Sequence, residues 1–478
     1  MLCFLPALCL PFAHHDNVRF FDKFYTSSSD NPEKRDPQYH MAYLLGRPLT
    51  AEIHQIIYTR ISHLRDLQIV RWMTVFVFAI CAGLLANIFY SFGLATLESL
   101  GLSVSIFILP GVQDAIIMLA IQNALAVGAV LWAYLISQKP PKPGLNGLLK
   151  CLAVCCLLLI SMLLYPQWSF FIFVPVLVKY LVTPAQSLWT IHKELLRSIL
   201  LFSLTAIFYY VYIKTFVSVN NAQAGSYAFT IDLNFLFWKS LSVFSTILPI
   251  AFNFWNIHTI TWLGLVLMGL TMVLLRERAV LCFLLIIFTV SFWLLIRSDL
   301  ILHRIFFVTS VMALAAFLVG ARNLFLIYGT VGRYIIICMM TAGLMGVHYL
   351  TSYNAMNYHL ELEFIKQRLM AHPKPLARIH IVLPTPDGKG YNGHATVDDT
   401  FNDKTASYNF ETDTLNLLKA ALQDMNVPSS WRVYSCEDKQ QQCVEHASKN
   451  YNLLVTHTNK DQAIYYSPHM VLIDLNDL

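Results

Sequence analysis

The feature that most constrains this chain is the scarcity of charge across its middle. Between Gly101 and Leu350 the only acidic residues are Asp114, Glu194, Asp232, Glu277 and Asp299. The stretches between them repeatedly reach about 20 apolar residues, which is the length of a helix that crosses a bilayer. The sequence therefore predicts a polytopic α-helical membrane protein.

The overall composition supports a membrane protein and excludes several other classes. Hydrophobic residues make up 56% of the 478 residues and charged residues only 13%, whereas soluble proteins carry roughly 25% charged residues. The 32 Phe and 23 Tyr residues are too many for a disordered chain. The net charge of +5 is small, and no zinc spacing, Walker loop or dinucleotide fingerprint is present, so we expect no nucleic-acid partner.

Ten apolar runs are predicted to cross the bilayer. They are residues 69–90, 102–110, 112–136, 148–164, 168–182, 199–216, 257–275, 280–296, 305–319 and 334–350. The apolar run 1–12 is too short to cross alone, so we interpret it as the outer part of a first span that begins upstream. Residues 241–255 are also apolar enough to cross.

Basic residues decide the predicted orientation. Four basic clusters lie between the apolar runs, at Lys139, Lys142 and Lys150, at Lys193 and Arg197, at Arg276 and Arg278, and at Arg322 and Arg333. All four can face the cytoplasm only if residues 241–255 lie in the interface or re-enter instead of crossing. This predicts about eleven spans with the N-terminus inside, and it puts loop 13–67, turn 110–114 and the C-terminal region outside.

The composition changes abruptly near residue 352. Residues 1–352 are predicted to form the transmembrane domain, and residues 353–478 a small soluble α/β domain. Helices are expected at 357–370 and 412–425, and strands at 377–383, 431–435, 452–456 and 470–474. In this tail Cys436 and Cys443 lie in a polar loop, where a disulfide is plausible in an oxidising compartment. Two free thiols are the alternative.

Polar residues gather in the first outer loop, which spans residues 13–67. Asp16 and Arg19 directly follow the first apolar segment, and Arg47 lies in a Gly-Arg-Pro-Leu sequence. Residues 50–64 then place apolar side chains at helical spacing, which is typical of a helix lying in the membrane interface. Isolated acid and arginine residues at the end of a span also form simple interfacial ion pairs, which is the structural alternative to a functional role.

These motifs resemble the GT-C-type membrane glycosyltransferases, and within them the O-antigen glucosyltransferase family of type II. The resemblance rests on Asp16 and Arg19, on the Gly-Arg-Pro-Leu element before an amphipathic helix, and on a Leu-Pro turn that leads to Asp114. It covers roughly residues 10–140. The family pattern has a second acid after the first, whereas Asn17 follows Asp16 here, so a single carboxylate remains.

The resemblance implies an inverting transfer of a sugar, typically glucose, from a polyprenyl phosphate carrier to a glycan on the periplasmic side of a bacterial inner membrane. Asp16 would be the general base that deprotonates the acceptor hydroxyl. Arg19 and Arg47 would bind the carrier phosphate, with Arg304 as a further candidate, and Asp114 would hold sugar hydroxyls or assist the base. The resemblance implies no cofactor with certainty. A divalent metal is compatible with the reaction, but nothing in the sequence supports one.

Two other functions fit the same hydropathy. A lipid-linked glycan flippase or other transporter would also have many spans, but it should carry ionisable groups at mid-bilayer depth, and here the span centres are nearly free of charge. A structural or interaction protein would work through its soluble tail. In that case substitution of Asp16 would have no effect.

Overall fold

The computed structural model describes most of the helical part of the chain and shorter pieces of its C-terminal region. The described residues are 2–13, 39–138, 145–183, 188–216, 234, 237–238, 277–294, 306–325, 331–370, 378–382, 418, 420–425, 432–436, 466–467 and 470–474. The chain divides into two compact units. The first contains residues 1–4, 38–55 and 72–350, and the second contains residues 5–37, 56–71 and 351–478.

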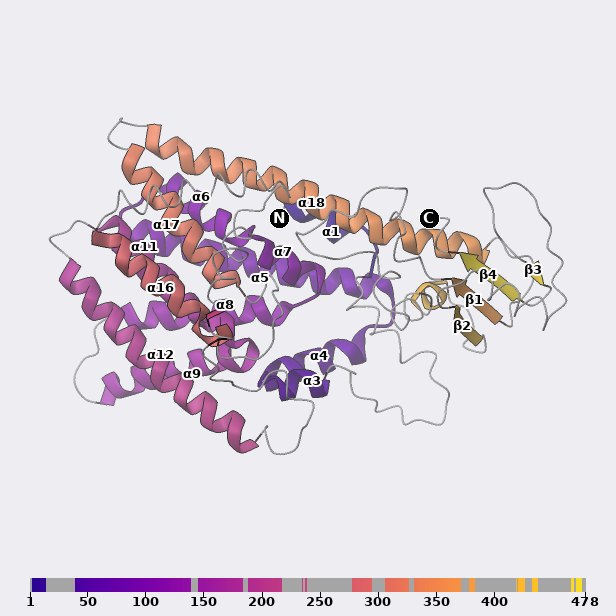
Figure 1. Cartoon of the computed structure of the whole chain (residues 1–478), viewed down its shortest axis with the longest axis horizontal. Helices are drawn as coiled ribbons and strands as arrows, with labels where there is room; N and C mark the ends of the chain where they lie inside the picture. Colours follow the sequence, from indigo (N-terminus) through magenta and orange to yellow (C-terminus); the bar gives the residue numbers. More distant parts are fainter. Residues whose placement is uncertain are drawn as a thin grey trace. The chain divides into compact units, whose positions relative to one another are not determined.

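Long apolar helices dominate the first unit. Within the described ranges, four helices are long and apolar enough to cross a membrane, namely α5 (Leu64–Ser91), α8 (Ile121–Gln138), α9 (Leu145–Leu164) and α12 (Leu188–Phe216) (Figure 1). The helices α6 (Thr96–Phe107) and α7 (Pro110–Ile117) meet at 55° and add a fifth span if they cross together. The predicted multi-pass helical membrane protein is confirmed by these helix lengths and their hydropathy.

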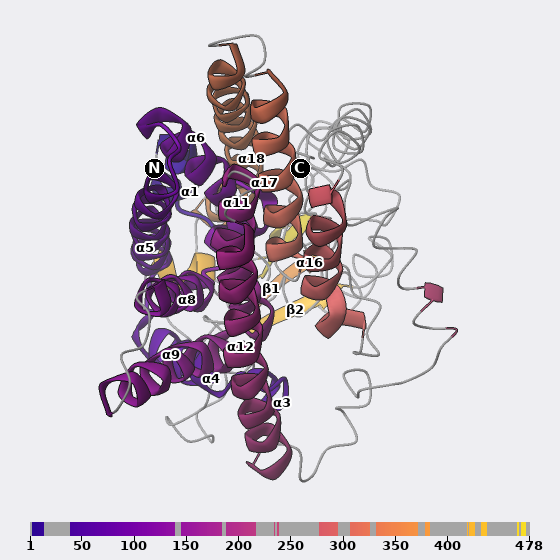
Figure 2. The ribbon, with the colours of Figure 1, turned by 90° about the vertical axis from the view of Figure 1, so that its left-hand side faces the viewer.

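Helices α8 and α9 form an antiparallel pair on which other elements pack. In the sequence Lys139, Pro140 and Pro141 follow the last residue of α8, and proline disfavours a continuing helix because it lacks an N–H and clashes with the preceding turn. The short helix α10 (Pro166–Ser169) then packs on α8, α9 and α17 (Phe307–Phe325), and leads through the 3₁₀ turn η3 (Phe170–Ile172) into α11 (Phe173–Val182). Helix α12 lies against α9 and α11, and α16 (Glu277–Leu294) against α17 (Figure 2).

Aromatic side chains fill the interior of this unit. Trp168 is fully buried and stacks on Phe307, with ring centroids 4.1 Å apart. Phe171 stacks on the same Phe307 ring, and Phe107 lies between Phe171 and Phe78. Because each large aromatic side chain removes roughly 150–250 Å² from contact with solvent, this cluster joins α5, α6, α10, η3 and α17 into one core.

The second unit combines the ends of several helices with a small sheet. It contains α1 (Leu5–Cys9) and the C-terminal part of α18 (Val331–Met370). Strands β1 (Arg378–Val382), β2 (Arg432–Cys436), β3 (Tyr466–Ser467) and β4 (Met470–Asp474) are ordered β2-β1-β4-β3. Strand β1 pairs in parallel with β2 and β4, and β3 pairs antiparallel with β4. Residues 420–424 are helical, and Asp424 forms an ion pair with Lys366 of α18.

Several elements differ from the sequence expectation. The predicted helix over 112–136 is broken between α7 and α8, where Leu119 adopts a left-handed conformation with φ 59°. The predicted span over 334–350 and the predicted helix over 357–370 form one helix, α18, because no proline or glycine separates them. Helix α12 begins eleven residues earlier than predicted, at Leu188.

Other expectations coincide with the structure or lie outside it. The strands predicted at 377–383, 431–435 and 470–474 coincide with β1, β2 and β4. The predicted strand at 452–456 and the ambiguous segment 241–255 lie outside the described residues. The count of eleven spans depends on such segments and stays a prediction, as does the domain boundary at residue 352.

Candidate functional site

The structure describes two of the site residues that the sequence predicts. Arg47 and Asp114 belong to the first unit, in the connection between α3 and α4 and in α7 respectively. Asp16, Arg19 and Arg304 lie outside the described residues. Cys436 is the last residue of β2 and Cys443 lies outside the described part, so their pairing stays a prediction.

The backbone around Arg47 is fixed by the residues on either side. Helix α3 (Tyr39–Leu44) ends in a Schellman motif, in which the N–H of Gly46 donates to Tyr43 O and the N–H of Arg47 donates to Ala42 O. Gly46 has φ +75°, a conformation that favours glycine. Pro48 is then the first residue of α4 (Pro48–Arg60), where its missing N–H costs no helical hydrogen bond. The Gly-Arg-Pro sequence therefore makes a tight corner between two helices.

The corner is held against α9 and α12 by close contacts. The Tyr209 hydroxyl of α12 donates a 3.0 Å hydrogen bond to Gly46 O. Thr50 of α4 donates to Leu164 O at the end of α9. The Arg47 guanidinium lies 3.9 Å from the centre of the Tyr165 ring, the residue that follows α9. Because aromatic stacking leaves the in-plane N–H groups of a guanidinium free to donate, Arg47 can still bind an anion.

The turn between α7 and α8 lies at the same end of the helical pair as Tyr165. It closes with hydrogen bonds from the N–H groups of Met118 and Ala120 to Asp114 O and Ala115 O, while Leu119 takes the left-handed position. A leucine in this conformation costs on the order of 1–2 kcal/mol. The strained turn sets the direction of the first residues of α8. Asp114 lies on the α7 side of it and is only 7% exposed.

Four carboxamide side chains are buried at this end. Gln113 belongs to α7, Gln122 and Asn123 to the first turn of α8, and Gln167 to α10, and each is at most 6% exposed. The side-chain carbonyl oxygen of each of the four has no hydrogen-bond partner among the residues that the structure describes. The same is true of Asn123 Nδ2. The Nε of Arg47 is also buried and has no hydrogen-bond partner among the described residues. We call these five residues, with the turn that precedes α8, the Gln122 end.

Unpaired buried amides indicate a place for a polar ligand. More than nine in ten buried polar groups are hydrogen-bonded in native proteins, because a lost partner costs about 1–3 kcal/mol. A carboxamide accepts and donates hydrogen bonds without charge, which suits a neutral ligand rich in hydroxyl groups. Arg47 adds a fixed positive charge that suits a phosphate. Ordered water is the alternative occupant.

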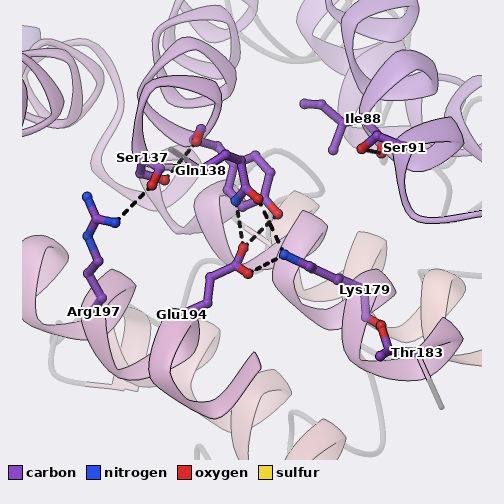
Figure 3. Close-up of polar contacts among 9 residues, drawn as sticks. Ile88, Ser91, Ser137, Gln138, Lys179, Thr183, Glu194 and Arg197 are labelled. Atoms are coloured by element: carbon purple, nitrogen blue, oxygen red, sulfur yellow. Dashed lines mark hydrogen bonds and ion pairs between the residues drawn. The ribbon is translucent and has the colours of Figure 1, made fainter. Parts of the chain in front are cut away.

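The opposite end of α8 carries a different kind of polar cluster. Glu194 of α12 accepts hydrogen bonds from the Tyr134 hydroxyl at 2.9 Å and from Gln138 Nε2 at 2.6 Å (Figure 3). Its second oxygen forms an ion pair with Lys179 of α11. Lys179 also donates to Gln138 Oε1 at 3.3 Å. We call these four residues the Glu194 cluster. It ties α8, α11 and α12 together.

A second ion pair lies near the same end. Arg322 of α17 donates to both carboxylate oxygens of Glu98 at 2.9 and 3.1 Å, and Glu98 also caps the start of α6 through the Ala95 N–H. Arg278 and Asn323 donate to the carbonyl groups at the end of α11, including Leu181 O. These side chains satisfy backbone groups at helix ends, which is a structural role.

Sequence reasoning missed the carboxamides and the Glu194 cluster. Lys179, a cation within a predicted span, pairs with Glu194. Glu194 is one of only five acids between residues 101 and 350, so an internal lysine and an isolated acid could have been matched. The closely spaced Gln113, Gln122 and Asn123 in otherwise apolar sequence are a comparable signal for the other end.

No group of three or more His, Cys, Asp or Glu side chains that could hold a metal ion occurs in the part of the chain that the structure describes. Comparison of the chain with protein-family models found no match. Comparisons with curated proteins and with solved structures found no match either.

Proposed function

We propose that the protein is an inverting glycosyltransferase, moving a sugar from a polyprenyl phosphate carrier to an O-antigen or another cell-surface glycan. The reaction would take place on the periplasmic side of a bacterial inner membrane. The observation that supports the proposal is the Gln122 end, where four carboxamide oxygens are buried without a hydrogen-bond partner among the described residues and Arg47 packs on Tyr165 at the end of α9. The sugar is a neutral hexose, glucose in the family that the sequence resembles.

The chemistry of a lipid-linked sugar suits these residues. A glycosyl phosphate already carries a good leaving group, so the reaction needs one base and no acid to protonate the departing oxygen. Arg47, fixed at its corner, would stabilise the charge that develops on the phosphate. The carboxamides would hold the sugar hydroxyls, and Asp114 would assist from α7. Asp16 is the proposed base, and Arg19 and Arg304 are further phosphate contacts.

The test is Asp16→Asn in a host that makes the acceptor glycan, with protein level and donor loading measured in parallel. We expect a well-expressed protein that still binds the polyprenyl phosphate sugar but leaves the glycan unmodified. Asp30→Asn, an acid in the same loop, is the matched control and should retain activity. Normal modification by the Asp16→Asn protein would remove Asp16 from the mechanism.

A second test addresses the sugar contacts directly. Asn123→Leu should weaken binding of a polyprenyl phosphate hexose by about tenfold, because a paired polar contact is worth about 1–1.5 kcal/mol. Binding of the sugar-free polyprenyl phosphate should not change. Equal loss for both lipids would argue against a sugar contact, and donor binding without transfer by the wild-type protein would favour a transporter.

A further inference from the structure

The second unit contains a buried arginine that the proposed function does not use. Arg71 of α5 is 0% exposed. Its Nη2 donates a 3.0 Å hydrogen bond to Phe12 O, and its guanidinium carbon lies 3.6 Å from the centre of the Phe12 ring. Within the described part of the chain, its Nε and Nη1 have no hydrogen-bond partner.

The surroundings of Arg71 are built from three segments of the same unit. Phe12 stacks on Tyr358 of α18, with ring centroids 5.9 Å apart, and His359 contacts Pro11 O at 2.8 Å. Gln68, one turn before Arg71, donates to Cys9 O at 2.9 Å. The chain over residues 9–12 is thus held by side chains from α5 and α18, and its ring covers one face of the guanidinium.

The three acids of this unit whose side chains the structure describes are engaged elsewhere. Asp66 accepts hydrogen bonds from the backbone N–H groups of Ser62 and His63. Glu363 and Asp424 both pair with Lys366. A buried guanidinium that lacks an anion bears a large desolvation cost, and proteins rarely keep such a group without a partner.

The position of Arg71 along α5 indicates which anion is available. About twenty residues without charge follow it to the end of the helix, and at 1.5 Å per residue they span about 30 Å, the apolar thickness of a bilayer. Arg71 therefore stands one residue before the apolar layer, at the level of lipid phosphates. An arginine at that level normally extends outward to the headgroups, whereas Arg71 is turned inward.

We propose that Arg71 is a binding site for a phosphate group, with the Phe12 ring covering one face of the guanidinium and the unpaired N–H groups donating to phosphate oxygens. The ring occupies the face of the guanidinium, and all N–H donors lie in its plane, so stacking and anion binding are compatible. The phosphate comes from a lipid headgroup or from a free phosphate ion. Arg71 belongs to the second unit and the residues of the Gln122 end to the first, and the test of the Arg71 site does not depend on sugar transfer.

The experiment follows thermal unfolding of the full-length protein in phosphate-free detergent. Inorganic phosphate and dihexanoyl phosphatidic acid are titrated separately, with chloride at matched ionic strength as the reference. We expect phosphate to raise the unfolding midpoint of the wild type. Arg71→Met should raise the half-saturating phosphate concentration by about tenfold or more. Arg65→Met, an exposed arginine of the same helix, should leave it unchanged.

The two probes distinguish the source of the phosphate. A response to inorganic phosphate supports a site open to free ions, and a response to the lipid alone supports a headgroup site. The proposal is overturned if neither probe exceeds chloride, or if Arg71→Met responds as the wild type does. It is also overturned if Asp16→Asn loses as much stability as Arg71→Met, because the partner would then be a carboxylate of the chain itself.

Arg71→Met could fail to fold, so a milder variant accompanies it. Arg71→Lys keeps the positive charge but replaces the planar set of donors with a single ammonium group. We expect it to fold and to bind phosphate several-fold more weakly than the wild type. Unchanged affinity in Arg71→Lys would overturn the planar contact proposed here.

Discussion

The two ends of helix α8 show opposite ways of burying polar side chains. At its C-terminal end, Gln138 and Tyr134 belong to the Glu194 cluster, in which hydrogen bonds and an ion pair join each residue to another side chain. At its N-terminal end, Gln122 Oε1 and both polar side-chain atoms of Asn123 have no hydrogen-bond partner among the described residues. The Glu194 cluster is thus a paired network at one end of the helix, where only Arg197 Nη2 nearby is buried without a partner among the described residues, and several carboxamide atoms are unpaired at the other end.

This difference fits the proposed function, in which the paired polar groups stabilise the fold and the unpaired ones bind a ligand. A completed network joins helices, because each of its members is stabilised by the others in a low-dielectric interior. An incomplete network weakens the empty protein and is retained where a ligand completes it. The strained turn at Leu119, which orients the incomplete end, is a second local cost at the same place.

The largest effect is expected from Arg322→Met, which tests the completed end. The substitution leaves the Glu98 carboxylate buried without its bidentate partner, and the free energy of unfolding should fall by about 3–5 kcal/mol. Denaturation in a series of detergent–SDS mixtures measures it. Lys193→Met, an exposed cation on α12, should change stability by no more than about 0.5 kcal/mol. Equal losses of unfolding free energy in the two variants would show that the Arg322–Glu98 pair does not stabilise this end.

Glu194→Ala should have a somewhat smaller effect, because the cluster is partly exposed. It removes the acceptor of Tyr134, Gln138 and Lys179, and we expect a loss of about 2–3 kcal/mol. Glu194→Gln keeps an acceptor without the charge and should lose less. The same unfolding assay applies, and a Glu194→Ala protein as stable as the wild type would show that the cluster does not hold the helices.

Gly46→Ala tests the corner that positions Arg47. An added Cβ would lie 2.6 Å from the Tyr209 hydroxyl, and φ +75° disfavours any side chain, so we expect a loss of about 1–3 kcal/mol. Gly83→Ala is the matched control, because nothing lies within 4 Å of its added Cβ. It should be neutral or stabilising by up to about 1 kcal/mol in the helix. Thermal unfolding of both variants distinguishes them.

The smallest effect, with the opposite sign, is expected at the incomplete end. Asn123→Leu removes an unpaired buried amide, so stability should stay the same or rise by up to about 1 kcal/mol. Gln138→Leu, on the same helix, breaks contacts with Glu194 and Lys179 and should lose about 1–2 kcal/mol. Thermal unfolding without ligand gives the sign of each change. A loss in both variants would erase the distinction between the two ends.

The sequence was sufficient for some of the helices. Apolar runs of spanning length predicted α5 and α9 within a few residues, because burial in lipid demands unbroken helix and leaves a strong pattern. The helix end at Gly46 and the helix start at Pro48 were not predicted, although glycine and proline favour these positions through their backbone restrictions. The site at Asp16 stays a prediction.

The geometry of the tertiary contacts could not be predicted from the sequence. The break at Leu119 uses a residue that normally avoids the left-handed region, so no local signal marks it. The partnership of Glu194 with Lys179 joins two helices, and its geometry depends on how α8, α11 and α12 pack. Whether Gln122 or Gln138 finds a partner is likewise decided by packing, since both are glutamines near the ends of one apolar helix.

The corner at Gly46 and Pro48 has a consequence for how a ligand would be received. Long cationic side chains usually lose much rotational freedom when they are captured by an anion, which lowers affinity. Here the backbone on both sides of Arg47 is locked and its head group already rests on Tyr165. The side chain is therefore ordered when the chain folds, so a phosphate bound here as proposed would require little further rearrangement.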